Sequence, residues 1–345
     1  MPPKLPSTGS TGYIGGSVLH TLATAHPDWP ITVLLRSVPP TFTSTYPSIT
    51  IIRGDYDATE TLSTAASNAD IVVHCGNSDH EPSLAALLAG LRRKTTPAHL
   101  IHLSGTGLVS DWASPDFLGT LNPRVWSDVA PADLQDIRSL PDTALHRGTE
   151  KMLHAAAREG GNVRVCVMCP PDIYGRGKGL GRTRSALVPF FVAEARKRGG
   201  VFYVGDGGNA RSWVHVEDLM RLYLRVVEAA AGGDAEVEKQ CFGENGYFFA
   251  GTQEHSHIEI ARAVGEVLAR QGVVEDQKPV QIGTEELDGM ANIPNFPKLA
   301  RYLFASNSRT KAERAEKLWE YKGEAPGLME CLEDDVVDCL ENGGR

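Results

Sequence analysis

The sequence contains no apolar run of the ~20 residues that a membrane-spanning helix needs. Its first residues, Met1-Pro2-Pro3-Lys4, also lack the apolar stretch of a secretory signal, so we expect a cytoplasmic, reducing environment. Basic residues form no stripe, and 34 Lys and Arg face 43 Asp and Glu for a net charge of −9, which argues against nucleic-acid binding. With 345 residues, of which 41% are hydrophobic, the chain can bury a large core.

Cysteines are also few, and their spacing indicates neither a disulfide framework nor a metal site. Cys166 and Cys169 have the two-residue separation of redox and metal motifs, but they lie in the apolar run 163–169, which is typical of a buried strand. Because no second Cys/His pair is near, we expect both thiols to pack in the core, and we expect no metal.

What the chain does contain is a glycine-spaced turn near its start, Ser7 to Gly16, followed by an amphipathic segment and the apolar run 31–35. Glycines at this spacing allow a tight turn and let a pyrophosphate approach the N-terminus of the next helix. A glycine triplet alone can be a plain structural turn, but the β-α-β context favours a dinucleotide site. The predicted cofactor contacts in the turn are Gly9, Thr11, Gly12, Tyr13, Ile14 and Gly15.

Residues 8–15 read Thr-Gly-x-x-Gly-Tyr-Ile-Gly, which resembles the fingerprint of the extended short-chain dehydrogenase/reductases, the NAD-dependent epimerase/dehydratase family. The resemblance extends over nearly the whole chain and implies an α/β fold, a Rossmann-like doubly wound parallel sheet with a smaller mixed α/β substrate-binding lobe. It implies a dinucleotide-binding domain at 1–170, to which 200–250 partly return. Residues 171–199 and 251–345 would form the lobe. Pro6 suits a central strand poorly, so we expect the first strand to be short or irregular.

The residue after the second predicted strand usually distinguishes NAD from NADP, since an acid there holds the ribose 2′-hydroxyl and an arginine accommodates a 2′-phosphate. Here that residue is Arg36, and no Asp or Glu stands at the strand end. This favours NADP, with NAD as the alternative; the other interpretation is an ordinary surface arginine. The resemblance adds further cofactor contacts: Asp55, Tyr56, Gly76, Pro170 and Ile173.

The family resemblance also implies a catalytic serine and a Tyr-x-x-x-Lys helix. The serine falls on Ser104, at the end of the fifth predicted strand, but the tyrosine and lysine positions carry His146 and Glu150. Histidine can transfer protons near neutral pH, and a carboxylate one helical turn away could orient it. We therefore expect either that His146 and Glu150 replace the family pair in catalysis, or that the redox chemistry is lost and His146 is only a cofactor contact or a surface residue.

Residues 211–219 resemble the family signature Arg-x-x-Val-His-Val-x-Asp-Leu, whose arginine faces the substrate. The resemblance thus implies that Arg211 faces the substrate. Thr106, the second candidate for the family's catalytic hydroxyl, and Tyr174, in a segment that resembles the family's Pro-Pro-x-x-Tyr-Gly turn, complete the predicted substrate residues.

Together these features predict an NADP-dependent oxidoreductase that acts on a small carbonyl/alcohol substrate. Two alternatives stay open: an epimerase or dehydratase that holds NAD(P) tightly, and a non-redox dinucleotide-binding protein. The expected partner is a small-molecule substrate, a homodimer stays open, and neither nucleic acid nor membrane is expected.

Overall fold

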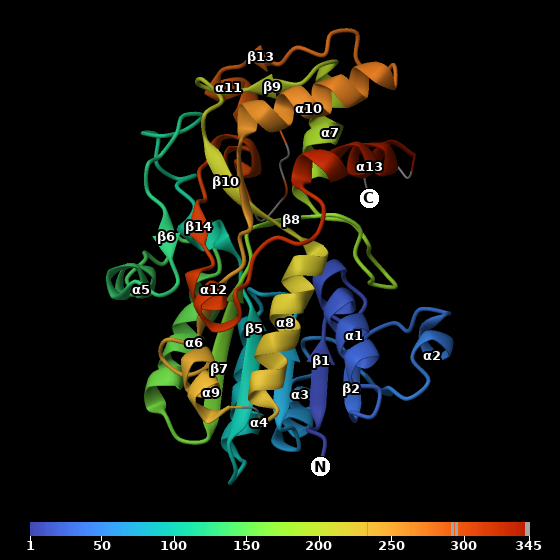
Figure 1. Ribbon diagram of the computed structural model, residues 1–345, viewed down its shortest axis with the longest axis vertical. Coiled ribbons are helices and arrows are strands. Elements are labelled where there is room, and N and C mark those ends of the chain that lie inside the picture. The colour runs from blue at the N-terminus through green and yellow to red at the C-terminus, as the bar shows by residue number, and fades with distance from the viewer. Residues whose placement is uncertain (233, 291–292, 294–295, 342–345) are drawn as a thin grey trace.

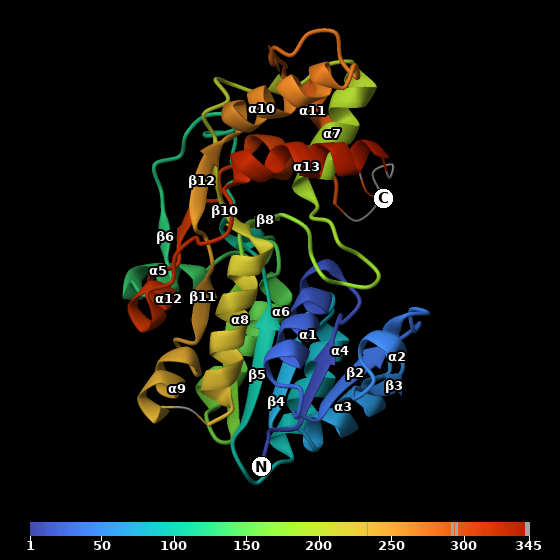
Figure 2. The same cartoon turned by 45° about the vertical axis from the view of Figure 1, so that its right-hand side comes forward.

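The computed structural model describes residues 1–345 except 233, 291–292, 294–295 and 342–345. A large sheet with helices on both faces forms one end of the molecule, and a smaller lobe of short strands and helices forms the other (Figure 1). The chain passes between the two halves several times, so the lobe is assembled from separate stretches of the second half of the chain (Figure 2).

The large sheet has seven strands in the order β11-β7-β5-β4-β1-β2-β3, and every neighbouring pair is parallel. This confirms the doubly wound sheet, whose order reverses between β1 and β4, where such folds open a ligand crevice. The strands are β1 (Leu5–Thr8), β2 (Ile31–Leu35), β3 (Thr50–Arg53), β4 (Ile71–His74), β5 (Ala98–Leu103), β7 (Val163–Cys169) and β11 (Tyr247–Phe249).

Alternate residues of the strands pack into two different hydrophobic cores, one on each face of the large sheet. Cys166 packs with the helices of one face, α1 (Tyr13–Ala25) and α8 (Val216–Ala230). Cys169 packs on the opposite face, which is covered by α3 (Thr59–Ser67), α4 (Glu81–Arg92) and α6 (Arg147–Glu159). Side chains of a strand point alternately to its two faces, so these two thiols are directed apart. Both are buried and free, as their setting in an apolar run predicted.

Strand β1 is short, as expected, yet it pairs in register with both of its neighbours. Leu5 N donates to Pro30 O on the β2 side, so the nitrogen of Pro6 faces β4. The register pairs with β4 begin at Ser7, so the proline removes one hydrogen bond of this ladder while β1 stays paired with both neighbours.

The lobe surrounds its own apolar core. Its three-stranded sheet has the order β12-β10-β8, and β13 pairs with β9. Its elements are β8 (Asp172–Tyr174), α7 (Leu187–Arg198), β9 (Phe202–Tyr203), β10 (Ala210–His215), β12 (Gln253–Ser256), α10 (His257–Arg270), β13 (Val280–Gln281), α11 (Thr284–Asp288), a π-helical turn η2 (Arg301–Ala305) and α13 (Leu328–Glu341). The remaining elements are α2 (Phe42–Thr45), the 3₁₀ turn η1 (Thr106–Val109), β6 (Trp126–Ser127), α5 (Pro131–Arg138), α9 (Ala235–Cys241), β14 (Thr310–Lys311) and α12 (Glu313–Trp319).

A buried network of hydrogen bonds between Asp128, Arg314 and the backbone of β11, which we call the staple, stabilises the β11 edge of the large sheet. The two carboxylate oxygens of Asp128 accept hydrogen bonds from Arg314 N at 2.9 Å and Phe249 N at 3.0 Å. The Arg314 guanidinium, at the start of α12, in turn donates to the carbonyls of Asp128 and Tyr247. Residues from the last third of the chain thus complete the edge of the first domain.

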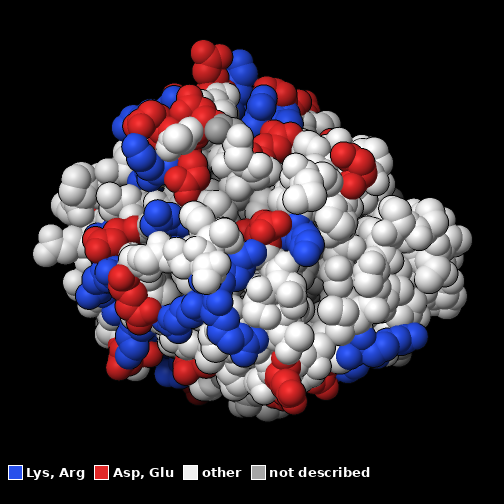
Figure 3. All heavy atoms as spheres, turned by 90° about the horizontal axis from the view of Figure 1, so that it is seen from below, with Lys and Arg blue, Asp and Glu red and all other residues white. Residues whose placement is uncertain are grey.

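None of the described helices combines the length and the apolar character that crossing a bilayer requires. Viewed from the end of the molecule that carries the large sheet, acidic and basic side chains are intermixed on the left of the view, several basic side chains adjoin one another below its centre, and the right carries few charges (Figure 3). Within the described part of the chain, no group of three or more His, Cys, Asp or Glu is arranged to hold a metal ion.

Candidate active site

The glycine turn between β1 and α1 packs directly against the end of β4. Gly9 has φ +73°, and a Cβ there would lie 2.2 Å from the carbonyl oxygen of Cys75. A Cβ on Gly15 would lie 2.4 Å from Gly9 O. The turn is therefore as tight as the spacing predicts, and it leaves the N-terminus of α1 at the mouth of a crevice.

Two cavities open on either side of this turn. The first, of about 210 Å³, lies at the ends of β2 and β3 and is lined by five predicted cofactor residues: Gly9, Thr11, Arg36, Asp55 and Tyr56. The exposed Arg36 forms no ion pair with a described residue. Burial raises the pKa of Tyr56, and the nearby Arg36 charge acts in the opposite sense. An exposed arginine side chain therefore lines this cavity at the end of β2.

The second cavity, of about 350 Å³, lies between the large sheet and the lobe. Its lining includes six predicted cofactor residues: Gly12, Tyr13, Ile14, Gly15, Gly76 and Ile173. Pro171 lines it as well, whereas Pro170 is buried and its carbonyl accepts a hydrogen bond from Thr106 N at 3.0 Å. Residues of the glycine turn therefore line both cavities.

Gly76 has a further reason to be glycine that the sequence did not reveal. A Cβ at this position would lie 2.6 Å from the Tyr56 ring. Packing of Tyr56 on Gly76 thus joins the end of β3 to the end of β4 beneath the crevice.

Ser104 directly follows β5, beyond Leu103, which lines the second cavity. Its hydroxyl donates to Glu150 Oε1 at 2.5 Å, and the Tyr247 hydroxyl donates to the same oxygen at 3.0 Å. Glu150 is fully buried, and its other oxygen lies 3.5 Å from His154 Nε2. The structure therefore brings Ser104 and Glu150 into contact, but this contact is buried.

The side chain of His146 has other partners than Glu150, although Glu150 N donates a backbone hydrogen bond to His146 O at 3.1 Å. It precedes α6 in a left-handed backbone conformation, φ 61°, and its Nδ1 lies 2.8 Å from Asp79 Oδ1. The expectation that Glu150 orients His146 is therefore wrong: His146 is outside the helix, so a spacing of four does not align the two side chains. The carboxylate at His146 is Asp79, which the sequence analysis missed although it lies just beyond the carboxyl end of β4.

The imidazole of His146 lies over the residue that follows Ser104. A Cβ on Gly105 would be 3.1 Å from His146 Nε2. Thr149 in the first turn of α6 donates to Ser78 O at 2.7 Å, which fastens the loop that carries Asp79 to this helix. The ring of His146 thus lies beside Gly105, the residue that follows Ser104 at the carboxyl edge of the sheet.

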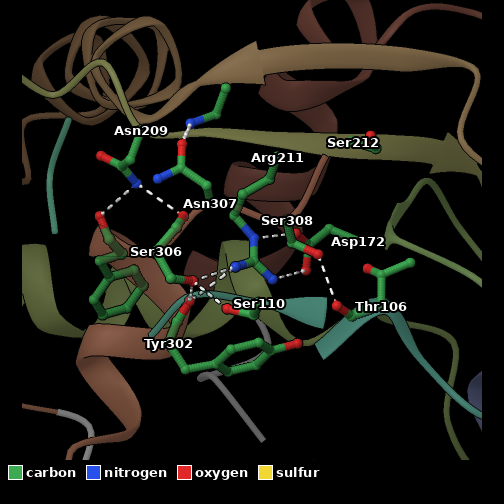
Figure 4. Close-up of polar contacts among 12 residues, drawn as sticks. Thr106, Ser110, Asp172, Asn209, Arg211, Ser212, Tyr302, Ser306, Asn307 and Ser308 are labelled. Carbon is green, nitrogen blue, oxygen red and sulfur yellow. Dashed lines mark hydrogen bonds and ion pairs between the residues drawn. The ribbon is translucent and has the colours of Figure 1, made fainter. Parts of the chain in front are cut away.

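The predicted substrate residues are all buried and engaged in internal contacts. Arg211 donates from Nε to Asp172 at 2.5 Å and from Nη1 to Ser306 Oγ at 2.8 Å, with its guanidinium 4.7 Å from the Tyr302 ring centre (Figure 4). The carbonyl of Thr106 accepts from Ser308 Oγ, and the Tyr174 hydroxyl donates to Pro326 O at 2.9 Å. Their substrate role stays a prediction, and these contacts argue instead for a structural one.

A second glycine-rich segment, residues 175–181, covers the first, and the sequence analysis did not connect the two. Gly181 N and Arg182 N both donate to Thr11 O, at 2.9 and 3.1 Å. A Cβ on Gly16 would lie 2.3 Å from Gly179 Cα. We call residues 175–181 the latch, since they close over the first turn of α1.

A glycine turn at the switch point of a doubly wound sheet defines a Rossmann-type dinucleotide-binding protein. The family model of the NAD dependent epimerase/dehydratase family matches residues 145–238. Oxidase ucsJ of Acremonium sp is 31% identical over 343 residues, which cover 96% of both chains. The dTDP-4-dehydro-6-deoxy-D-allose reductase of Streptomyces bikiniensis is 24% identical, covering 76% of this chain and 80% of the relative.

Among solved structures, the dTDP-glucose 4,6-dehydratase of Bacillus anthracis in complex with NAD superposes with a TM-score of 0.65 at 13% identity, covering 99% of this chain and 97% of the other. The chain belongs to the NAD-dependent epimerase/dehydratase family of extended short-chain dehydrogenases/reductases. It is thus an enzyme of a family that comprises oxidoreductases, epimerases and dehydratases and works with a nicotinamide dinucleotide.

Proposed function

We propose that this enzyme is an NADP(H)-dependent oxidoreductase that acts on a small alcohol/carbonyl pair. The observation that carries the proposal is the His146–Asp79 pair, 2.8 Å apart, beside Ser104 at the end of β5. A histidine held by a carboxylate is a proton-transfer group that needs no neighbouring lysine. It can therefore take over the proton chemistry that the family assigns to its tyrosine.

The glycine turn, Arg36 and the two cavities would hold the cofactor, with the pyrophosphate at the N-terminus of α1 and the 2′-phosphate at Arg36. When bound, the nicotinamide supplies the hydride exchange. The chain's own part is to bind the substrate oxygen at Ser104 and to exchange its proton at His146.

A substrate panel tests this proposal. Secondary alcohols with NADP and their matching ketones with NADPH, for example 1-phenylethanol with acetophenone and cyclohexanol with cyclohexanone, are followed by nicotinamide absorbance. Reproducible turnover of a member of the panel supports an oxidoreductase. If no absorbance changes although NADPH binds, the proposal fails.

We expect Arg36→Ala to weaken NADPH binding by about 10- to 100-fold and to leave NADH binding within about twofold, because a charge-assisted contact to the 2′-phosphate contributes about 1.5–3 kcal/mol. Titration followed by nicotinamide fluorescence measures both constants. Arg53→Ala is the matched control, since it removes an exposed arginine at the end of β3 that lines neither cavity. Equal loss of NADPH and NADH affinity would remove Arg36 from cofactor selection.

One observation favours a second candidate, an epimerase or dehydratase that retains its cofactor through the catalytic cycle. The latch is bonded to the turn at Thr11, and α13 supports it through Asp335, which accepts from Gly175 N. Such a cover slows cofactor exchange. Relatives named as a reductase and a dehydratase acting on dTDP-sugars are compatible with either chemistry.

We expect Gly179→Ala to speed cofactor release by about tenfold or more, because its Cβ would lie 2.1 Å from Gly12 O and would force the latch off the turn. Stopped-flow displacement of NADPH measures this rate. Gly199→Ala would be strained by its own positive φ, so Gly283→Ala, with open space around its Cβ, is the better control. Copurified cofactor in the wild-type protein, with no net absorbance change during turnover, would select the retained-cofactor function.

A further inference from the structure

The geometry points to an alcohol, and not a carbonyl compound, as the ligand for which the unliganded site is arranged. This inference rests on the proposed redox function. The two polar groups next to Gly105 are held as hydrogen-bond acceptors, Ser104 by Glu150 and His146 by Asp79. Glu150 and Asp79 are then positioning residues, because they make Ser104 and His146 accept hydrogen bonds from a ligand instead of donating them.

The hydroxyl of Ser104 has a single hydrogen, and that hydrogen is directed away from the crevice. It is given to Glu150 Oε1 at 2.5 Å, an oxygen that can only accept in this bond. Tyr247 gives its own hydrogen to the same oxygen, and burial raises the pKa of Tyr247 well above its ordinary value, which keeps the phenol a donor. Ser104, 5% exposed, therefore presents only lone pairs to a ligand.

The imidazole of His146 is likewise held so that it presents a hydrogen-bond acceptor to a ligand. A carboxylate can only accept, so the 2.8 Å contact with Asp79 requires the hydrogen of His146 to be on Nδ1. In the neutral ring Nε2 then carries a lone pair. That atom is the one next to Gly105, and the ring stays 20% exposed, so a ligand at the Ser104–Gly105 step can reach it.

An alcohol satisfies this arrangement and a carbonyl does not. The hydroxyl hydrogen of an alcohol donates to one of the two acceptors, whereas a carbonyl oxygen would face both lone pairs without a hydrogen between them. Polar atoms that lose water without gaining a hydrogen-bond partner cost binding free energy, so the site discriminates between the two molecules.

The reaction that follows is an oxidation. The C–H bond of the alcohol breaks and its hydride passes to oxidised NADP, which takes up both electrons. The O–H bond breaks, its proton passes to His146 Nε2 and the C=O bond forms. Asp79 then faces an imidazolium, whose charge it stabilises.

The first test determines which ring nitrogen of His146 carries the hydrogen, and it needs no substrate. Nitrogen-15 NMR of the histidine side chains of the full-length protein, at an alkaline pH where imidazoles are neutral, gives the tautomer of each ring. His146→Gln assigns the signal. We expect His146 to carry its hydrogen on Nδ1 and to lose that preference in Asp79→Ala. A hydrogen on Nε2 in the wild-type protein overturns the proposal.

The second test measures binding in complexes that cannot react. The probes are the alcohol that turns over fastest in the panel, added to the NADPH complex, and its own ketone, added to the NADP complex. We expect the alcohol to bind at least about tenfold more tightly, which is the value of one hydrogen bond. Equal binding, or tighter binding of the ketone, overturns the proposal.

Glu150→Met removes the acceptor and frees the Ser104 hydrogen to donate to a ketone. It is made in a Tyr247→Phe background, so that no buried phenol is left without a partner, and Tyr247→Phe alone is the matched control. We expect the preference for alcohol to fall by about tenfold in the double variant and to stay within about twofold in the control. NADPH affinity and melting temperature report whether the fold is kept.

These outcomes separate the two proposals. An unchanged preference in a folded double variant overturns the role of Glu150 while leaving the proposed function intact. Failure of the whole panel to turn over overturns the proposed function, and the NMR experiment still decides whether His146 is held as an acceptor.

Discussion

Replacing His146 by alanine should lower kcat by about a thousandfold and leave the NADPH dissociation constant within about threefold of wild type. Proton transfer by a positioned side chain typically contributes about 10²–10⁴ to the rate, and no tyrosine stands at this position to take over. His146 lines neither of the two cavities, so the dinucleotide should bind as before.

Steady-state kinetics and nicotinamide fluorescence give the two constants. His20→Ala, a change in a histidine of α1 that lines neither cavity, is the control and should leave both constants unchanged. Turnover retained in His146→Ala would remove the histidine from the mechanism. Loss of NADPH affinity equal to the loss of turnover would make it a cofactor contact instead.

The second large effect is expected at the glycine turn. Gly15→Ala puts a methyl group 2.4 Å from Gly9 O and 3.0 Å from Cys75 Cβ, and the neighbour at 2.4 Å is backbone that cannot move aside cheaply. The first turn of α1 must shift away from β4, and its amides no longer converge on the pyrophosphate. We expect NADPH binding to weaken by about 100-fold or more and the melting temperature to fall by several degrees.

Gly283→Ala is the matched control, because a Cβ there meets nothing within 4 Å and φ is not positive. Titration and thermal unfolding of both variants measure the outcome. NADPH affinity unchanged in Gly15→Ala would mean that the dinucleotide does not use this turn.

The large sheet was predictable because its strands are short, nearly continuous apolar runs. Residues 31–35 coincide with β2, and residues 163–169 coincide with β7. Strands that are buried on both faces have such continuous apolar sequences, and the glycine turn predicts the connection from β1 to α1. Arg36, Asp55 and Tyr56 fall into one cavity for the same reason, since each follows the carboxyl end of a parallel strand.

The catalytic geometry was less predictable, because side-chain direction depends on where a helix begins. The spacing of His146 and Glu150 suggested one helix face, but α6 starts at Arg147 and His146 has a left-handed backbone. Its partner Asp79 is 67 positions away in the sequence, and no local pattern encodes that contact. The family signature places Arg211 at a substrate-facing position, but it does not show the pairing with Asp172, which depends on how β8 and β10 lie side by side.

The staple at the β11 edge has a consequence for how the chain is made. During synthesis on a ribosome, β7 emerges about 80 residues before β11 and about 150 residues before Arg314, so it waits as an uncapped edge strand. Such an edge can pair with another nascent chain until residues 247–249 and the Asp128–Arg314 contacts close it. A fragment that ends after β7 therefore keeps a permanently open edge, and the first domain cannot be separated cleanly from the rest of the gene product.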